Sequence, residues 1–526
     1  MKRKYIIIVV FIALISKVSA QQTGNFTDNI TFMGQQRTLA CHVPSNYDST
    51  VSYNLMIGLH GLGDNAVNYR NALINTLSWP SIFANTVFIF PDGGDDQNKD
   101  FYMPAGDEAV IQEAINYAIQ NYNIDTNNII LQGFSLGGRS ALKYGLDNHG
   151  TFKGLLLNTP AIQGLADAVN DPNGSLMFDY SNAPQIPIYV TIGVNDQIYI
   201  YNWMPVNERL KKNNAKVKTL EIAGMGHSVP SQQYISPAIT FFADPASSDY
   251  DIDLFEIETD QRTCNPDIQP KCYIRNKGAQ PVTSVDIDYA IGSSSGTYTW
   301  TGNIGMYEHA VVNLPLMTAG SGEQDLDLSI GDINGSFTDT INTDNDLSYM
   351  IYVGDNPVGI PYAEGFEANM EGWTYEETGS IFQWYVDGDV KKDGMYSIAT
   401  FNTILMFYTL GYIESFYSPV MDLSGVASPD LTFDLAYNYH KYTPPYFTNE
   451  VLFADTLVIS VSTDCGQTFQ EIYRKGGADL ATAPDPIINP LSLQQVFFTP
   501  DSGEWRNEAV DLSAFAGQTE VMLKFG

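Results

Sequence analysis

Short, nearly continuous apolar runs alternate with polar stretches over the first half of the chain. Such runs are typical of parallel strands that are buried on both faces. We expect strands at 53–61, 86–94, 127–135, 152–160, 186–196 and 216–227. Between them, residues 107–122 repeat apolar side chains at helical spacing, which predicts an amphipathic helix. Strands that alternate with helices predict a mostly parallel sheet with helices on both faces, over residues 28–243.

The pattern changes after residues 243–251. From 250 to 353 the apolar runs are short, alternating and broken by turns, which predicts a small β-sandwich. From 361 to 526 the chain is again rich in strand patterns, and a larger sandwich of jelly-roll type is expected. The chain stops within an apolar run, so we expect this last domain to be incomplete. The fold class is multidomain: an α/β domain followed by two all-β sandwiches.

The first twenty residues form a separate segment. Lys2, Arg3 and Lys4 precede an apolar run that ends near Ile15, and small residues lead to Ala20. The run is shorter than the roughly 20 residues that cross a bilayer. This arrangement predicts a signal peptide over residues 1–20, with a membrane anchor as the alternative. We therefore expect a secreted or cell-surface protein without a transmembrane segment.

Composition narrows the possible partners. The formal net charge is −34, from 60 acidic and 26 basic residues, and such a chain repels the phosphate backbones of nucleic acids. Four cysteines allow three connectivities, of which Cys264 with Cys272 would close a small loop. Cys41 and Cys465 lie far apart in sequence. The sequence shows no zinc-type cluster, and we expect neither a metal nor a cofactor.

The pattern G-x-S-x-G, which presents a nucleophilic serine in many hydrolases, occurs twice. GFSLGG (133–138) follows an apolar strand and precedes a helical stretch, so its turn would lift Ser135 above the edge of the sheet. Side chains at Gly133 and Gly137 would clash with the neighbouring strand and helix. GSSSG (292–296) lies between two alternating strands, where it predicts a hairpin loop around Ser294.

A serine hydroxyl needs a base and an orienting acid to become a nucleophile. In sheets of this kind the order along the chain is nucleophile, acid, histidine. Of the two histidines between Ser135 and the end of the α/β segment, His149 is expected at a helix end and His227 in a loop after the last strand. For the acid we choose Asp196, which also follows a strand, over its competitors Asp167, Asp171 and Asp179.

The developing negative charge on an ester carbonyl needs hydrogen-bond donors. The stretch LHGLGD (59–64) follows the first parallel strand, where the backbone N–H of Leu62 can point into the site. The N–H of Leu136 is the natural second donor, and His60 is then expected to be structural.

With these motifs the segment 28–243 resembles the α/β-hydrolase superfamily. LHGLGD and GFSLGG look like motifs of the phospholipase/carboxylesterase group, and the arrangement is similar to polyhydroxyalkanoate depolymerase-like and feruloyl-esterase-like enzymes. The resemblance implies Ser135, Asp196 and His227 as triad, although thioesterase-like members usually carry glutamine where this chain has Leu136. Residues 250–353 resemble CARDB or fibronectin-like sandwiches, and 361–526 resemble MAM-like jelly rolls beside secreted bacterial hydrolases.

The sequence thus predicts a secreted serine carboxylic-ester hydrolase that acts through an acyl-enzyme. The expected substrate is an extracellular polymer, a polysaccharide or polyester, or its ester decorations. Two alternatives stay open: a serine peptidase of the same fold, and a non-catalytic adhesin with a hydrolase-like scaffold. Residues 161–180 and 199–204 are candidate pocket walls, and the sandwiches are candidate anchors to a polymer or the cell surface.

Overall fold

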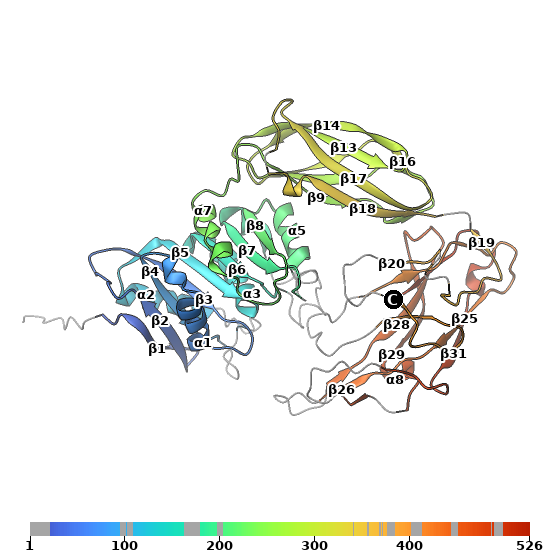
Figure 1. Cartoon of the computed structure of the whole chain (residues 1–526), viewed down its shortest axis with the longest axis horizontal. Coiled ribbons are helices and arrows are strands. Elements are labelled where there is room, and N and C mark those ends of the chain that lie inside the picture. Colours follow the sequence, from blue (N-terminus) through green and yellow to red (C-terminus); the bar gives the residue numbers. More distant parts are fainter. Residues whose placement is uncertain are drawn as a thin grey trace, which may run out of the picture. The chain divides into compact units, whose positions relative to one another are not determined.

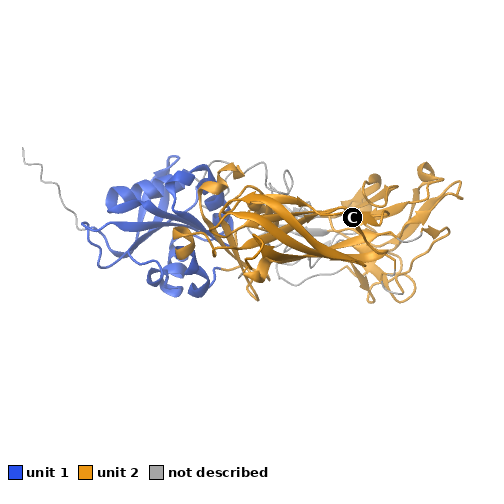
Figure 2. Ribbon diagram, turned by 90° about the horizontal axis from the view of Figure 1, so that it is seen from above, with its two compact units in different colours: residues 1–158, 229–239 blue, residues 159–228, 240–526 orange. Residues whose placement is uncertain are grey.

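The computed structural model describes the chain with several gaps and divides it into two compact units (Figures 1 and 2). Unit 1 comprises residues 1–158 and 229–239, and unit 2 comprises 159–228 and 240–526. The predicted signal peptide lies outside the described residues, as do most of the candidate pocket walls. The described residues are 21–94, 101, 109–162, 179–196, 203–339, 341–354, 357–367, 370, 372–375, 384–400, 413–442, 451–484, 487–488 and 498–526.

Unit 1 contains six strands in the order β1-β2-β4-β3-β5-β6. Strand β3 is parallel to β4 and β5, and β5 is parallel to β6. Nearly every residue of β3, β4 and β6 is buried, which is why their sequences read as continuous apolar runs. The four predicted strands are confirmed as β3 (Tyr53–Leu59), β4 (Thr86–Pro91), β5 (Ile124–Phe134) and β6 (Gly154–Asn158).

An antiparallel hairpin at the start of unit 1 was not predicted. Strands β1 (Gly24–Phe32) and β2 (Gln35–Val43) pair along their full length, and β2 is antiparallel to β4. The predicted domain start at residue 28 therefore falls inside β1. The turn of this hairpin carries Met33 and Gly34 at φ of 49° and 80°. Such positive φ values favour glycine, so a glycine between two half-apolar runs is the sequence signal that could have revealed the hairpin.

Helices in unit 1 follow the expected pattern. Helix α2 (Val110–Asn121) buries most of the apolar face that the spacing predicted: Val110, Ile111, Ala114, Ile115 and Ala118. Ile119, which the predicted face also included, is 43% exposed, so the prediction is wrong at that residue. Helix α3 (Leu136–Asp147) begins directly after Ser135. The remaining helical elements are α1 (Ala66–Asn71), a π-helix (Ala72–Thr76), α6 (Gln232–Ile235) and 3-10 turns at Trp79–Ser81 and His149–Thr151.

The first part of unit 2 contains the other two predicted parallel strands. Strand β7 (Ile188–Gly193) pairs in parallel with β8 (Val217–Ile222), and helix α5 (Met204–Lys212) lies between them in sequence. A 3-10 turn at Tyr180–Gln185 precedes β7. Helix α7 (Pro237–Ala243) leads toward the β-rich remainder of the chain.

Residues 252–353 form two facing sheets of five and three strands, in the orders β10-β18-β17-β13-β14 and β15-β12-β9. Side chains from both sheets share one buried cluster, in which Ile274 and Ile287 are fully buried. This arrangement is compatible with the predicted small sandwich. The strands are β9 (Ile252–Glu258), β10 (Arg262–Thr263), β11 (Asp267–Ile268), β12 (Lys271–Asn276), β13 (Val282–Ile291), β14 (Ser294–Ile304), β15 (His309–Asn313), β16 (Met317–Thr318), β17 (Gly322–Ile333) and β18 (Asp346–Val353), with a 3-10 turn at Asn342–Asp344.

The C-terminal segment is also built from strands. A five-stranded sheet, β20-β23-β32-β28-β29, carries a core to which Leu431 and Phe433 of β25 contribute from another sheet. The runs that predicted strands form β25 (Asp430–Leu435), β28 (Thr456–Ser462) and β32 (Met522–Phe525). The other elements are β19 (Val358–Gly359), β20 (Thr374–Tyr375), β21 (Tyr385–Asp387), β22 (Ser397–Ala399), β23 (Phe416–Tyr417), β24 (Met421–Asp422), β26 (His440–Tyr442), β27 (Val451–Phe453), β29 (Gln470–Gly476), α8 (Gly477–Leu480), β30 (Ile487–Ile488), β31 (Arg506–Asp511) and a 3-10 turn at Ser513–Phe515.

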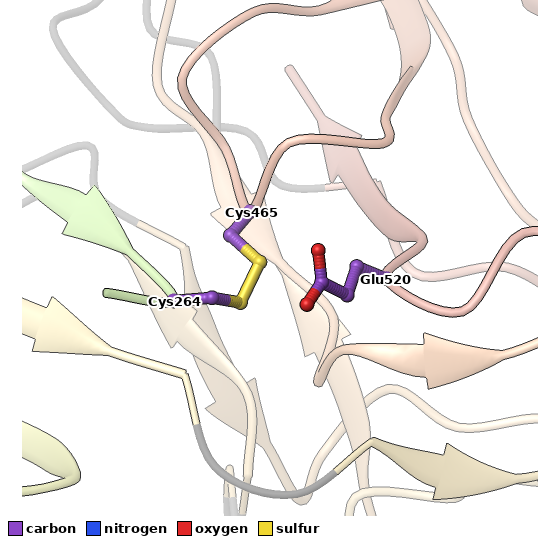
Figure 3. A group of neighbouring side chains, drawn as sticks. All are labelled: Cys264, Cys465 and Glu520. Atoms are coloured by element: carbon purple, nitrogen blue, oxygen red, sulfur yellow. A yellow bond between two sulfur atoms is a disulfide. The ribbon is translucent and has the colours of Figure 1, made fainter. Parts of the chain in front are cut away.

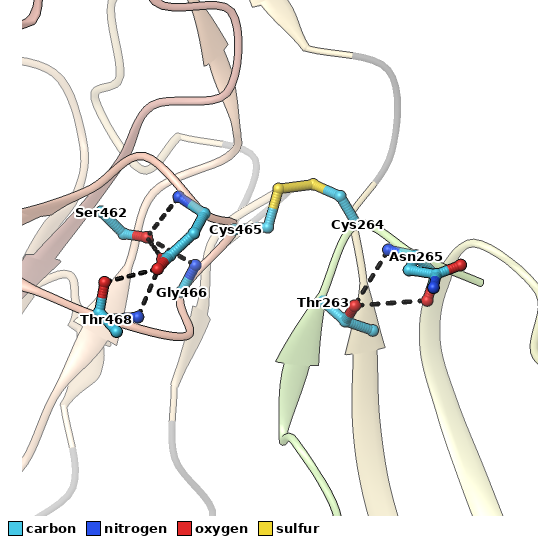
Figure 4. The surroundings of a disulfide bond; sticks show 8 residues. Thr263, Cys264, Asn265, Ser462, Cys465, Gly466 and Thr468 are labelled. Carbon is cyan, nitrogen blue, oxygen red and sulfur yellow. Dashed lines mark hydrogen bonds between the residues drawn. A yellow bond between two sulfur atoms is a disulfide. The ribbon is translucent and has the colours of Figure 1, made fainter. Parts of the chain in front are cut away.

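The Cys264–Cys272 disulfide considered from the sequence is not formed. Cys264 is bonded to Cys465, 201 residues away, and the turns on both sides are held by hydrogen bonds (Figure 4). Cys264 directly follows β10 in the five-stranded sheet, whereas Cys272 lies in β12 of the opposite sheet and is fully buried in the core. Sequence proximity therefore does not bring these two sulfur atoms together. Cys272 and the buried Cys41 are free thiols.

The carboxylate of Glu520 approaches the two bonded sulfur atoms, and all three possible ligand atoms lie within 4.8 Å of one another (Figure 3). A metal would need thiolates, and these sulfur atoms already share a covalent bond. This cluster is therefore not a metal site. Within the described residues, no helix is both long and apolar enough to cross a membrane.

Candidate active site

Ser135 occupies the sharp turn between strand β5 and helix α3. Its backbone has φ of 53° and ψ of −119°, a region that costs a non-glycine residue on the order of 1–3 kcal/mol. The turn is held on both sides: the Ser135 N–H donates to the Asn158 carbonyl at 3.1 Å, and the Ser135 carbonyl accepts from Arg139 N–H at 3.2 Å. A strained serine on a strand-to-helix turn is the geometry that G-x-S-x-G elbows share.

The glycines around Ser135 are required by close backbone approach. A Cβ on Gly133 would lie 2.2 Å from the Gly137 carbonyl oxygen of α3. A Cβ on Gly137 would lie 2.4 Å from the carbonyl oxygens of Leu59 and His60, at the end of β3. Both distances are far below van der Waals contact, so the predicted clash with helix and strand is confirmed.

A buried polar chain supports the strand end below Ser135. The Gln132 side-chain amide donates to the Tyr69 hydroxyl at 2.7 Å and to the Asn158 side-chain oxygen at 2.9 Å. Burial raises the pKa of Tyr69, so its hydroxyl stays protonated. Asn158 thereby links two roles, because its carbonyl also holds the Ser135 N–H. The sequence did not predict these hydrogen bonds, because a lone Gln in a strand and an Asn at a strand end carry no distinctive signal.

The loop that follows β3 makes a tight turn against Ser135. The Asp64 N–H donates to the Gly61 carbonyl at 3.3 Å, and Gly63 adopts a φ of 72°. A Cβ on Gly61 would lie 3.2 Å from the Ser135 Cβ. The loop thus passes beside the candidate nucleophile, and the side chain of Leu62 is 49% exposed there. Leu136 begins α3, so its N–H has no partner within the helix.

Asp196 and His227 meet within unit 2. His227 Nδ1 lies 2.8 Å from Asp196 Oδ2, and the side chain of Asp196 is fully buried while that of His227 is 37% exposed. The carboxylate can only accept, so Nδ1 carries the proton in this contact. The imidazole is then fixed in the tautomer whose Nε2 can act as a base.

The loops that carry these two residues are joined by their backbones. They follow the parallel neighbours β7 and β8, and the Asn195 N–H donates to the Met225 carbonyl at 3.0 Å. A Cβ on Gly193 would lie 2.0 Å from that same carbonyl oxygen, so only glycine permits this approach. The sheet register and one glycine therefore bring Asp196 to His227 across 31 residues of sequence.

The competing residues have structural partners. His149 follows α3, and its Nδ1 lies 3.4 Å from the Leu146 carbonyl. The carboxylate of Asp179 accepts from the Ser181 N–H at 3.0 Å and caps a 3-10 turn. Asp167 and Asp171 lie outside the described residues. The hairpin predicted around Ser294 is confirmed, but Ser294 itself already begins β14 after a turn at 292–293, and its hydroxyl donates to the Thr318 carbonyl at 2.8 Å.

Comparison with known proteins defines the class of enzyme. Residues 30–234 match the family model described as "Esterase: Putative esterase". The curated "Probable feruloyl esterase C" of Aspergillus terreus is 26% identical over 184 residues, which cover 34% of this chain and 67% of that protein.

Solved structures similar to this chain include a ferulic acid esterase of Anaeromyces mucronatus in complex with ferulic acid, at 19% identity and a TM-score of 0.34. That match covers 43% of this chain and 91% of the other. An S-formylglutathione hydrolase of Staphylococcus aureus matches at 15% identity and a TM-score of 0.33, with 42% and 99% covered.

The family match and the curated relative support a carboxylic ester hydrolase. The family match falls on the α/β segment that carries Ser135, Asp196 and His227. Here the expected enzyme class is confirmed.

Proposed function

We propose that this protein is a secreted serine esterase in which Ser135, His227 and Asp196 form a catalytic triad. The observation that carries the proposal is the backbone of Ser135, a strained non-glycine residue between β5 and α3. Strain of this kind persists only where the surrounding structure enforces it, and it concentrates at functional sites. The close approaches at Gly133 and Gly137 supply that enforcement.

In this mechanism His227 Nε2 takes the proton of the Ser135 hydroxyl as the oxygen attacks the ester carbonyl. Asp196 holds the imidazole and stabilises its charged form, which the 2.8 Å contact supports. The backbone N–H groups of Leu62 and Leu136 stabilise the oxyanion. The alcohol leaves, and water activated by the same histidine releases the acid from Ser135.

For the substrate we propose an extracellular polymer or its ester decorations, such as aryl esters of a polysaccharide. The curated relative is a feruloyl esterase by its printed name, which supports an aromatic acyl group. The half-exposed Leu62 supports the same choice, because it follows Gly61, which approaches Ser135, and an apolar residue in this loop suits an apolar acyl group.

For the location we propose export from the cytoplasm. The Cys264–Cys465 disulfide supports this, since such bonds persist in oxidising compartments. The expected signal peptide at residues 1–20 is consistent with the same route. The β-rich segments after residue 250 would then hold the polymer or the cell surface.

The decisive experiment compares Ser135→Ala with Ser294→Ala, the serine of the second G-x-S-x-G stretch. Both variants and the parent are tested with a fluorophosphonate probe, with a panel of feruloylated, acetylated and hydroxyalkanoate esters, and with aminoacyl amides. We expect Ser135→Ala alone to lose labelling and turnover by at least about 10³-fold.

A folded parent protein that neither labels nor cleaves any ester would support the scaffold alternative. Cleavage of aminoacyl amides in preference to esters would support the peptidase alternative. Loss of labelling in Ser294→Ala but not in Ser135→Ala would overturn the assignment of the nucleophile.

A further inference from the structure

His60 is a buried histidine that the proposed triad does not use. Only 1% of its surface is exposed, and its ring packs 5.0 Å from the ring of the buried Phe101. Its Nδ1 lies 2.8 Å from the carbonyl oxygen of the next residue, Gly61. Its buried Nε2 has no hydrogen-bond partner in the described part of the chain. A buried polar atom without a partner is costly, so a compensating role is expected.

The contact defines the tautomer of the ring. A carbonyl oxygen can only accept, so His60 Nδ1 carries the proton and donates to Gly61. Among the described residues, Nε2 is then an acceptor without a donor, in a ring that packs against Phe101.

The Gly61 carbonyl belongs to the same peptide unit as the Leu62 N–H. In a trans peptide these two groups point in opposite directions. The carbonyl is held by two donors, His60 Nδ1 at 2.8 Å and the Asp64 N–H at 3.3 Å. The first donor comes from the buried side of the loop, so the Leu62 N–H is turned away from His60.

This peptide unit lies beside the candidate nucleophile, because a Cβ on Gly61 would lie 3.2 Å from the Ser135 Cβ. We infer that His60 is a positioning residue: its Nδ1–H fixes the Gly61–Leu62 peptide so that the Leu62 N–H is preorganised to bind the oxyanion of the ester reaction. This inference rests on the proposed function, in which Leu62 N–H is an oxyanion donor. The unpaired Nε2 is consistent with a ring retained for orientation rather than for stability.

The test uses the full chain and three variants. His60→Phe keeps a flat ring against Phe101 but removes the donor, and His60→Asn keeps a side-chain N–H. His149→Phe is the matched control, because His149 also contacts a carbonyl, that of Leu146, at a helix end. Ser135→Ala defines the background for every ester.

Removing one oxyanion donor costs about 10²–10³ in kcat, and a loosened donor costs less. We expect His60→Phe to lower kcat by roughly 10–100-fold with KM within about two-fold, and to slow phosphonylation by the same factor. His60→Asn should recover part of this loss, and His149→Phe should match the parent. The melting temperature of His60→Phe should not fall, because the unpaired Nε2 is removed.

A direct readout does not depend on activity. With ¹⁵N-labelled histidine, six ring systems are observed, and the signal lost in His60→Phe belongs to His60. We expect Nδ1 of His60 to carry a proton, unchanged by covalent phosphonylation of Ser135. An Nε2–H tautomer, an unchanged kcat in His60→Phe, or a loss explained wholly by lower stability would each overturn the inference. A parent protein with no Ser135-dependent labelling would instead overturn the proposed function, while the tautomer would still report on the Gly61 contact.

Discussion

The carboxylate of Asp253 lies at the centre of a buried charge cluster in unit 2, and its removal offers a sharp stability test. Asp253 in β9 contacts Arg275 Nη2 at 2.7 Å and Lys211 Nζ of α5 at 3.0 Å, with side-chain exposures of only 2–3% for Asp253 and Arg275. Burial opposes the charged carboxyl, but the neighbouring Lys211 and Arg275 lower the pKa of Asp253 to about 2.

Burial also lowers the pKa of Lys211, which by itself would favour a neutral amine. The charged form is favoured here by geometry, since the ammonium lies 3.0 Å from a carboxylate that is itself held ionised by Arg275. The perturbation is Asp253→Asn, which keeps the shape and removes the charge that both cations face. Two cations would then remain buried without their shared counter-ion.

The magnitude follows from two estimates. A pKa lowered from 3.8 to about 2 corresponds to about 2–3 kcal/mol of folding free energy at neutral pH. Removing one partner of a buried ion pair typically costs about 3–5 kcal/mol. We therefore expect a loss of about 3 kcal/mol, or a fall of roughly 6–12 °C in melting temperature for a cooperative segment of 150–250 residues.

Scanning calorimetry measures the melting temperatures of the parent and of Asp253→Asn, and Glu258→Gln is the matched control. Glu258 of β9 pairs with Lys271 of β12 at 2.6 Å, but both side chains are more than 40% exposed. An exposed pair contributes about 0–1 kcal/mol, so this variant should melt within about 4 °C of the parent. The reasoning is refuted if Asp253→Asn shifts the melting temperature no more than Glu258→Gln does.

Three further outcomes are expected. Because the pKa of Asp253 in the folded protein lies below its ordinary value of 3.8, this carboxylate stabilises the folded state above about pH 4 and ceases to do so as the pH falls toward 2. The melting temperature should therefore fall more steeply with acid in the parent than in Asp253→Asn. Burial raises the pKa of each of the two free thiols, Cys41 and Cys272, to about 12, so neither should react with Ellman's reagent in the native protein. The denatured protein should show two reactive thiols, and denatured protein treated with a reductant should show four. Gly137→Ala should lower both the melting temperature and ester turnover, because the new Cβ would lie 2.4 Å from two carbonyl oxygens. The control Gly150→Ala should behave as the parent, because its Cβ would have no atom within 4 Å. Equal effects of the two substitutions would contradict this account of the packing.

Local patterns were sufficient to predict the elements that position the site. Strands β3 to β8 and helix α2 were readable because burial on both faces, or on one helical stripe, imposes a periodicity that short windows contain. The context of the two G-x-S-x-G stretches was readable for the same reason, since one lies before a helix and the other between alternating strands.

Other features depend on partners that no window contains. A local glycine marks the β1–β2 turn, but the place of this hairpin in the sheet depends on the pairing of β2 with β4. Cys264 is bonded to Cys465 rather than to Cys272 because β10 and β12 belong to opposite sheets. The sequence by itself determined the candidate residues Ser135, Asp196 and His227 and the order of their loops. Only the tertiary structure decided the strained backbone of Ser135, the contact of Asp196 with His227, and the His60 hydrogen bond that orients a peptide. The physical reason is that the first two depend on backbone segments remote in sequence that approach closely where glycine removes the Cβ, and such distances are set by sheet register, which a linear pattern does not encode. The His60 bond joins neighbouring residues, but the ring that makes it packs against Phe101, which is remote in sequence.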